Sequence, residues 1–214
     1  MLKNILIDLD GTLTDPKVGI TTSARYGLAK IGHAIADNDN IDWIIGPPLK
    51  ASLAKILNVA LDDDLAEQAL QAYRERFAVT GLFENEVFEG VAETLAELKH
   101  RGFKLFIATA KPTVYAKQIL EHFQLAQYFD VIYGSELTGE RTNKGDLIEY
   151  ILQQEQLDPA ECLMVGDREH DIFGARRFAI ETIAVEYGYG SAEELDAAQP
   201  KARIQHFAEL LKHV

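Results

Sequence analysis

The sequence predicts an α/β fold, a doubly wound parallel sheet with a small all-helical segment inserted after its first strand. Three observations predict it. Residues 3–9 are apolar on both faces of a strand, which is typical of a parallel strand covered by helices. After residue 87, strand-like and helix-like segments alternate. Residues 16–85 show helical periodicity and no convincing strand.

The alternating part is built from segments whose ends are set by local signals. Residues 90–103 are expected to form a helix, because Val91, Leu95 and Leu98 share one face and Gly102 stands where helices commonly end. The elements expected next are, in order, a strand at 104–109, a helix at 114–123, a strand at 129–134, a helix at 145–154, a strand at 161–166, a short helix at 171–177 and a strand at 181–187. The tail, residues 202–214, is expected to form one closing helix.

Helical periodicity in the inserted segment occurs in three stretches, residues 18–32, 50–60 and 63–80. The sequence therefore predicts two domains. A Rossmann-like core comprises residues 1–15 and 86–214, and a helical cap comprises residues 16–85.

Composition excludes several classes of partner. The chain has 214 residues and a formal net charge of -13, so a basic surface for a nucleic-acid polymer is not expected. No apolar run is long enough to span a membrane and the first residues do not resemble a secretory signal, so we expect a cytoplasmic protein without a membrane partner. The single cysteine, Cys162, is expected to be a buried thiol. The sequence does not indicate an oligomeric state.

Polar residues cluster at the predicted strand ends. Asp8 and Asp10, Thr109, Gly134 and Ser135, and Gly166 and Asp167 all follow or end strands. The carboxyl ends of parallel strands meet at one edge of a sheet, and ligands of such folds bind there. The sequence therefore predicts one site at this edge.

Asp8 and Asp10 lie two residues apart, so both side chains can point into one pocket. Two carboxylates about 4 Å apart repel by roughly 4 kcal/mol at an effective dielectric constant near 20. A divalent cation would offset this repulsion, and oxygen ligands favour Mg²⁺. Asp167 and Asp171 supply further carboxylates, and Lys144 is the leading candidate for a second cation.

The turn Leu9–Thr12 is expected to add backbone N–H groups to the pocket. Gly11 lets the chain approach a bound group, and successive amides can form an anion-binding nest. Together with the metal, Lys144 and Thr109, this inventory fits a phosphoryl group, which needs neutralisation on several oxygens.

Four segments carry a resemblance to a known family. DLDGTLTD at 8–15, IATAKP at 107–112, Lys144 within RTNKGD and GDREHD at 166–171 resemble the four ordered motifs of the haloacid dehalogenase-like superfamily, phosphatase branch. The resemblance covers essentially the whole chain, including a helical cap inserted after the first motif.

The resemblance implies roles for individual residues. Asp8 would be the nucleophile that forms an aspartyl-phosphate, and Asp10 the general acid and then the base that activates water. The Asp10 carbonyl, Asp8 and Asp167 would bind Mg²⁺, and Asp171 would orient the metal's water shell or hold Lys144. The residues implied for phosphate binding are Gly11, Thr109, Ala110 and Lys144.

A narrower resemblance, to phosphoglycolate phosphatases and the bacterial 5′-nucleotidase-like subgroup, rests on segments such as IGPPLK at 45–50 and YGYGS at 187–191. Three positions depart from the wider pattern. Ala110 replaces the usual serine or asparagine, His170 replaces an asparagine, and Lys50 stands where relatives present an arginine from cap to substrate. Lys50 is therefore the candidate cap residue for substrate binding, as a point charge rather than a bidentate group.

The function expected from these residues is a Mg²⁺-dependent phosphomonoesterase acting on a small phosphorylated metabolite, either a 5′-nucleotide or a compound like phosphoglycolate. Three alternatives stay open. A phosphomutase would use the same aspartyl-phosphate, a dehalogenase of the same fold would need neither the metal nor Asp10, and a non-catalytic phosphate-sensing module would not turn over.

Overall fold

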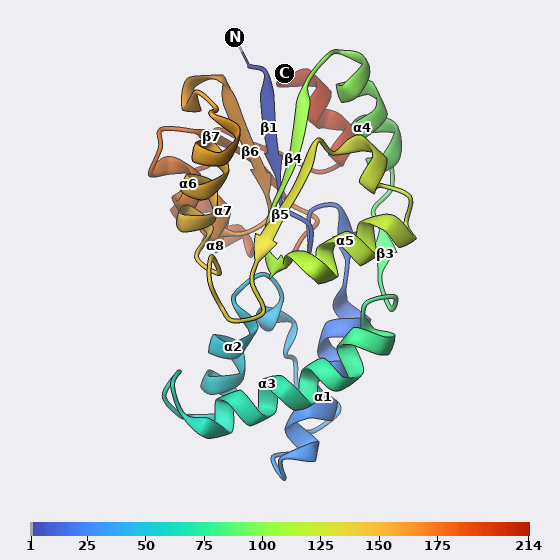
Figure 1. The fold of residues 1–214 in the computed structure, drawn as a ribbon, viewed down its shortest axis with the longest axis vertical. Helices are drawn as coiled ribbons and strands as arrows, with labels where there is room; N and C mark the ends of the chain where they lie inside the picture. Colours follow the sequence, from blue (N-terminus) through green and yellow to red (C-terminus); the bar gives the residue numbers. More distant parts are fainter. Residues whose placement is uncertain (1) are drawn as a thin grey trace. The chain divides into compact units, whose positions relative to one another are not determined.

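The computed structural model describes residues 2–214 (Figure 1). Met1, which the predicted core range includes, lies outside the described residues. The chain divides into two compact units. The α/β unit consists of the residues up to Asp15 together with Val87–Val214, and the helical unit is Pro16–Glu86.

The α/β unit is built on a six-stranded sheet with the strand order β5-β4-β1-β6-β7-β8, and every pairing is parallel. Its strands are β1 (Asn4–Ile7), β4 (Lys104–Pro112), β5 (Val131–Ser135), β6 (Cys162–Gly166), β7 (Glu181–Val185) and β8 (Ala202–Ile204). Successive strands extend the sheet from β1 first in one direction and then in the other. The predicted doubly wound parallel sheet is therefore confirmed.

Register aligns the strand ends that the sequence singled out. Ile7, the last residue of β1, pairs with Ile107 of β4 and with Val165 of β6. The alignment places the ends of β1 at Ile7 and of β6 at Gly166 at the same edge of the sheet, while β4 continues to Pro112. This alignment brings Asp8 and Asp167 to neighbouring positions.

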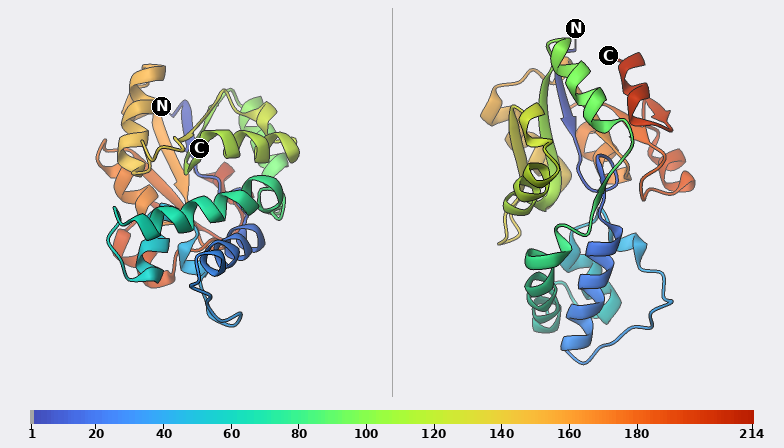
Figure 2. Two further views of the ribbon diagram at one scale, coloured as in Figure 1. Left: turned by 60° about the horizontal axis from the view of Figure 1, so that its bottom comes forward. Right: turned by 90° about the vertical axis from the view of Figure 1, so that its right-hand side faces the viewer.

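Helices cover both faces of this sheet (Figure 1). Leu6, Phe106 and Met164 form a core beneath α6 and α7. Figure 2 gives two further views, and Figure 1 shows α4 and α5 on the side of the sheet opposite to α6 and α7. The helices and 3-10 turns of the unit are α4 (Val91–His100), α5 (Thr113–His122), η3 (Ala126–Tyr128), α6 (Lys144–Glu155), η4 (Pro159–Glu161), α7 (Glu169–Arg176), α8 (Ala192–Ala198) and η5 (Phe207–Lys212).

The C-terminal part of the chain differs from the expected single helix. Residues Ala202–Ile204 form strand β8, which pairs with β7, and a short 3-10 turn follows. The prediction of one closing helix over 202–214 is wrong because β7 offers an unpaired edge whose backbone groups β8 satisfies. The apolar residues that suggested a helix, Phe207 and Leu210, are buried in the 3-10 turn.

The helical unit contains the three helices that periodicity predicts: α1 (Lys17–Lys30), α2 (Leu49–Leu57) and α3 (Asp64–Arg76). The side chain of Asp63 accepts a hydrogen bond from Leu65 N and caps α3, as expected for an acidic N-cap. A 3-10 turn, η1 (Asp42–Ile44), precedes α2, and a π-helical turn, η2 (Phe77–Gly81), extends α3. The segments that join the two units, β2 (Thr14–Asp15) and β3 (Glu86–Val87), pair as a two-stranded sheet.

Across residues 2–214, none of the helices combines the length and the apolar character needed to cross a membrane.

Candidate active site

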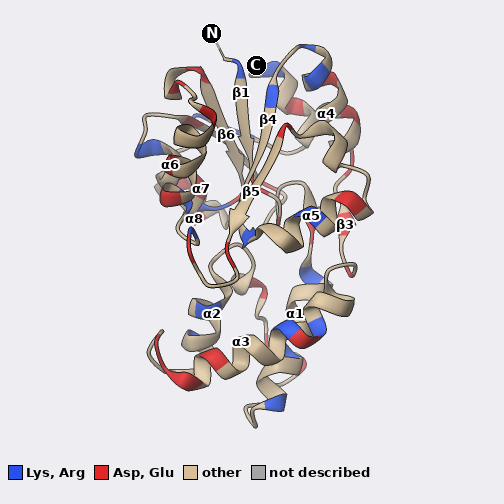
Figure 3. Ribbon diagram, in the orientation of Figure 1, with Lys and Arg blue, Asp and Glu red and all other residues tan. Residues whose placement is uncertain are grey.

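Charged residues of both signs are spread along the ribbon (Figure 3). Among residues 2–214, only six charged side chains are buried, and all belong to the α/β unit: Asp8, Asp10, Lys111, Lys144, Asp167 and Asp171. Burying an ionised group is costly unless it is paired or binds a ligand. This concentration of buried charge marks the candidate active site, and the six residues are called the buried charge cluster below.

Three carboxylates of the cluster converge. Asp8 follows β1, Asp167 follows β6, and Asp171 lies in the first turn of α7. Each offers a carboxylate oxygen, and these three oxygens lie within 4.8 Å of one another. The sheet edge thus brings together acids from two distant parts of the sequence.

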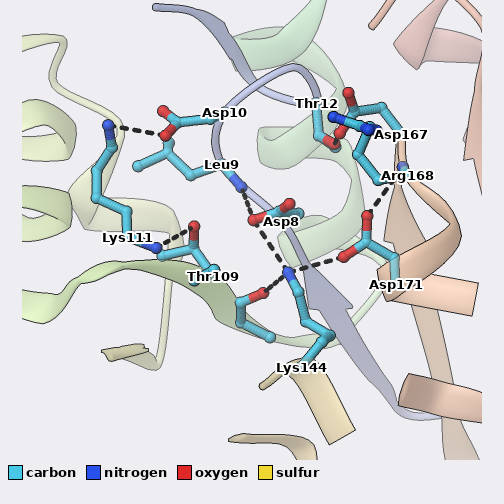
Figure 4. Close-up of polar contacts among 12 residues, drawn as sticks. Asp8, Leu9, Asp10, Thr12, Thr109, Lys111, Lys144, Asp167, Arg168 and Asp171 are labelled. Atoms are coloured by element: carbon cyan, nitrogen blue, oxygen red, sulfur yellow. Dashed lines mark hydrogen bonds and ion pairs between the residues drawn. The ribbon is translucent and has the colours of Figure 1, made fainter. Parts of the chain in front are cut away.

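Lys144 lies between two of these acids (Figure 4). It is the first residue of α6, whose N-cap residue Asn143 accepts hydrogen bonds from backbone N–H groups of the first turn. Its Nζ lies 2.7 Å from Asp171 Oδ1 and 3.2 Å from Asp8 Oδ1, and it donates to Ala108 O at 2.6 Å. Burial alone would lower the pKa of Lys144, but the two carboxylates outweigh burial and raise it. The ammonium group is therefore held in its charged form.

Asp167 receives its hydrogen bonds from neutral groups. Its Oδ2 accepts from Tyr189 N at 2.7 Å, and its Oδ1 accepts from Thr12 Oγ1 at 3.4 Å. Burial raises the pKa of Asp167 well above the ordinary value, and the nearby carboxylates of Asp171 and Asp8 raise it further. Neutral donors do not cancel the carboxylate's charge, so the environment of Asp167 favours an added cation.

The donor set of the three converging acids fits Mg²⁺. Asp8, Asp167 and Asp171 offer hard oxygen ligands at one point, which is what Mg²⁺ prefers. The net charge of the cluster also favours a divalent cation. The cluster contains four carboxylates and two ammonium groups, and one divalent cation would balance the excess negative charge. These residues are therefore suited to hold the metal.

The third ion pair of the cluster, between Lys111 and Asp10, is not among the contacts predicted from the sequence. Lys111 Nζ lies 2.7 Å from Asp10 Oδ2, and both side chains are buried (Figure 4). The other carboxylate oxygen of Asp10, Oδ1, is buried and has no hydrogen-bond partner among residues 2–214. Burial raises the pKa of Asp10, and Lys111 opposes part of that rise.

A usable signal for Lys111 was present in the sequence. Lys111 stands two residues after Thr109, and residues two apart in a strand point to the same side. The strand expected from the sequence ends at Thr109, whereas β4 continues to Pro112 with a shift of register between Ala108 and Pro112. The longer strand carries Lys111 to the site.

The turn after Asp8 differs from the predicted anion nest. Gly11 N donates to Thr14 O, Thr12 N donates to Leu9 O, and Leu9 N donates to Asp8 Oδ1. The prediction is wrong for these three N–H groups, because the turn closes on itself and uses them internally. Gly11 instead provides space. It has a φ of +83°, and a Cβ there would lie 2.3 Å from Asp167 Oδ2.

The remaining predicted residues lie in different surroundings. Thr109 is buried, and its hydroxyl accepts a hydrogen bond from Lys111 N at 3.3 Å. Ala110 is half-buried, and its carbonyl accepts from Ser135 Oγ at 2.7 Å. His170 is exposed in the first turn of α7. Lys50, in the helical unit, pairs with Glu67 Oε2 at 2.7 Å.

Residues 5–185 match the model of one protein family, haloacid dehalogenase-like hydrolase. The match covers most of the chain and includes the whole buried charge cluster. The chain belongs to this family. The resemblance that the four motifs carry is thus confirmed.

Curated relatives of this haloacid dehalogenase-like hydrolase include enzymes named for phosphate chemistry. It is 48% identical over 197 residues to a 5′-nucleotidase of Pseudomonas aeruginosa, covering 92% of this chain and 88% of the relative. It is 29% identical over 218 residues to a phosphoglycolate phosphatase of Vibrio vulnificus, covering 98% and 95%. It is 38% identical over 192 residues to the tyrosine-protein kinase PtkA of Mycobacterium tuberculosis, covering 90% of this chain and 65% of the relative.

A solved structure agrees with this assignment. The crystal structure of a predicted phosphatase from Clostridium acetobutylicum has a TM-score of 0.94 and 42% sequence identity to the chain, covering 100% of this chain and 98% of that one. The family, the relatives and the fold together identify the protein as an enzyme, a phosphatase of the haloacid dehalogenase-like family that hydrolyses phosphoric monoesters.

Proposed function

We propose that the protein is a Mg²⁺-dependent phosphomonoesterase that hydrolyses a small phosphorylated metabolite through an aspartyl-phosphate on Asp8. One observation carries the proposal. The buried Asp8 carboxylate shares the ammonium group of Lys144 with Asp171, inside the group of three converging acids. A nucleophile in this setting has a fixed cation beside it where phosphate oxygens would carry negative charge.

The first step forms a bond between an oxygen of Asp8 and phosphorus while the bond from phosphorus to the ester oxygen breaks. Asp10 gives a proton to the departing oxygen. In the second step Asp10 takes a proton from water, the water oxygen bonds to phosphorus, and the bond from phosphorus to Asp8 breaks. Inorganic phosphate leaves and Asp8 is regenerated.

Asp10 is suited to both roles by opposing influences. Burial raises the pKa of Asp10, which favours the protonated form that an acid needs. The ammonium group of Lys111 lowers the same pKa, which favours the carboxylate that a base needs. We propose that the ammonium group of Lys111 holds the Asp10 side chain in position and keeps both its protonated and its ionised form accessible.

Asp8, Asp167 and Asp171 are the side chains suited to hold Mg²⁺. The Asp10 carbonyl would be a further oxygen ligand, as the family resemblance implies. When bound, the ion would neutralise the charge that develops on the phosphoryl oxygens. Lys144 and the Thr109 hydroxyl are proposed to bind phosphate oxygens, with Gly11 and Ala110 lining the same position. Lys144 keeps its place through Asp171 and the Ala108 carbonyl.

The proposed substrate is a 5′-nucleotide or a compound like phosphoglycolate, because relatives named for each of these substrates match nearly the whole chain. We also propose that residues 16–85 act as a cap that selects the substrate and that Lys50 contributes to its binding. The ion pair between Lys50 and Glu67 would then have to open or be shared when substrate binds.

The test is phosphate release from a panel of nucleoside 5′-monophosphates, phosphoglycolate and hexose phosphates, with and without EDTA. We expect release from at least one small ester, loss of release after chelation, and recovery with Mg²⁺. The Asp8→Asn variant should lose at least about 1,000-fold in turnover, since the nucleophile is removed. Full activity after exhaustive chelation, or intact turnover by this variant, would refute the proposal. Isomerised hexose phosphate as the product would indicate a mutase instead.

A further inference from the structure

The loop after β7 has the sequence YGYG, residues 187–190, and no step of the proposed reaction uses it. It begins in the α/β unit, where Glu186 N donates to Ile204 O at 2.9 Å. The loop contacts Asp167, one of the three converging acids.

The loop backbone lies directly against Asp167. Tyr189 N donates to Asp167 Oδ2 at 2.7 Å. Gly188 makes the approach possible, because a Cβ at this position would lie 2.3 Å from Asp167 Cβ and 2.5 Å from Gly11 O. Any larger residue at 188 would push the loop, the acid or the turn at Gly11 out of place.

The two tyrosine side chains fasten the loop to the segment that follows the nucleophile. Tyr187 donates its hydroxyl proton to Thr12 O at 2.7 Å, and its ring packs on Phe88 with centroids 4.6 Å apart. The hydroxyl of Tyr189 donates to the Asp15 carboxylate. Thr12 in turn reaches Asp167 through its own hydroxyl. The acid, the loop and the residues after Asp8 therefore form one connected network.

Asp167 needs this support more than the other acids do. Lys144 pairs with Asp8 and Asp171, whereas the hydrogen bonds to Asp167 come from a backbone N–H and a threonine hydroxyl. Groups that hydrogen-bond a metal-ligating carboxylate orient it, and replacing such groups typically weakens metal binding about 10- to 100-fold.

We propose that Tyr189 is a positioning residue for the metal site, which acts through Asp167. Its backbone N–H orients the carboxylate, and its hydroxyl, anchored on Asp15, keeps that N–H in place. The inference rests on the proposed Mg²⁺ site and adds a residue outside the ligands.

The test uses the full chain and MgCl₂ without substrate. Isothermal titration calorimetry should show that Tyr189→Phe, which keeps the backbone N–H but loses the hydroxyl, binds Mg²⁺ about 10-fold more weakly than the wild type. Asp15→Ala should weaken binding to a similar extent, because it removes the acceptor of the same hydrogen bond. In kinetic assays the Mg²⁺ concentration for half-activation should rise, while kcat at saturating Mg²⁺ stays within about twofold.

Tyr133→Phe is the matched control. Tyr133 also donates to a carboxylate in the α/β unit, Glu155 Oε1 at 2.5 Å, outside the buried charge cluster. The Mg²⁺ affinity of the Tyr133→Phe variant should equal that of the wild type. Unchanged affinity in Tyr189→Phe, or an equal loss in Tyr133→Phe, would overturn the inference while leaving the proposed function intact. If the wild type itself fails to bind Mg²⁺, the proposed metal site fails first and the inference with it.

Discussion

Two lysine–aspartate ion pairs in this protein have nearly the same length in opposite surroundings. In the α/β unit, Lys111 Nζ lies 2.7 Å from Asp10 Oδ2, and the side chains are 4% and 11% exposed. In the helical unit, Lys17 Nζ lies 2.6 Å from Asp42 Oδ2, and the side chains are 50% and 31% exposed. The two ion pairs therefore differ in the burial of their side chains and not in the distance between their charged atoms.

The difference in burial changes how much each ion pair can contribute to the stability of the fold. An exposed pair contributes about 0–1 kcal/mol to stability, because water already solvates both charges. A buried pair must first lose that solvation, which costs several kcal/mol per ion, so it is weak evidence for a stabilising role. The burial of the Lys111–Asp10 pair is therefore consistent with the catalytic role proposed above, whereas the Lys17–Asp42 pair is an ordinary surface ion pair of the helical unit.

The largest expected effect comes from replacing the acid of each pair. Asp10→Asn should lower kcat by about 1,000-fold, because the side chain can no longer give or take a proton. Asp42→Asn should leave kcat within about twofold, since it removes only an exposed charge. Steady-state kinetics with the best substrate of the panel would measure both. Comparable losses in the two variants would show that burial does not distinguish the pairs.

A smaller effect is expected from the lysines. Lys111→Met should lower kcat about 100-fold by removing the charge that positions Asp10. Lys17→Met, which breaks the exposed pair, is the matched control and should keep nearly full activity. If Lys111→Met retains wild-type kcat and KM, Asp10 does not depend on its ion pair. Partial recovery in Lys111→Arg would indicate that positive charge is the feature required.

The buried charge cluster should also reduce stability when no metal is present. Asp167→Asn removes a buried charge that its donors do not neutralise, so the free energy of unfolding in EDTA should rise by about 1–2 kcal/mol. The folded-state pKa of Asp167 is raised, so its contribution to stability is present at low pH and lost as pH rises through that pKa. The gain should therefore be larger at pH 8 than at pH 5.

Urea denaturation would measure this gain, and saturating Mg²⁺ should reverse the order by stabilising the wild type. A variant that is less stable than the wild type in EDTA at pH 8 would contradict the account.

The smallest effect is expected in the helical unit. Arg76 donates to both carboxylate oxygens of Glu84, and this hydrogen bonding lowers the pKa of Glu84. The lowered pKa stabilises the fold above the ordinary carboxyl pKa, and the contribution is lost as pH falls through the folded-state value. Glu84→Gln should therefore cost about 0.5 kcal/mol at pH 7 and almost nothing once the pH is well below the folded-state pKa of Glu84. A cost that is independent of pH would point to packing instead.

The order of the strands and helices could be read from the sequence because it depends on local patterns. Apolar runs such as residues 4–7 identify buried parallel strands, and periodic apolar residues such as Val91, Leu95 and Leu98 identify helices. The motif at 8–15 located the first acids in the same way. The tail was the exception, because strand β8 forms only where the edge of β7 is available.

The sequence by itself determined the fold class, the family and the acids at the strand ends, since each depends on residue type and short-range spacing. Tertiary structure alone decided which groups meet. Lys111 reaches Asp10 because β4 continues past Thr109. Tyr189 reaches Asp167 because the loop after β7 passes close to the turn at Gly11. The N–H groups of that turn form hydrogen bonds within the turn itself. Such contacts depend on register and on the path of the backbone in space, which no pattern of neighbouring residues specifies.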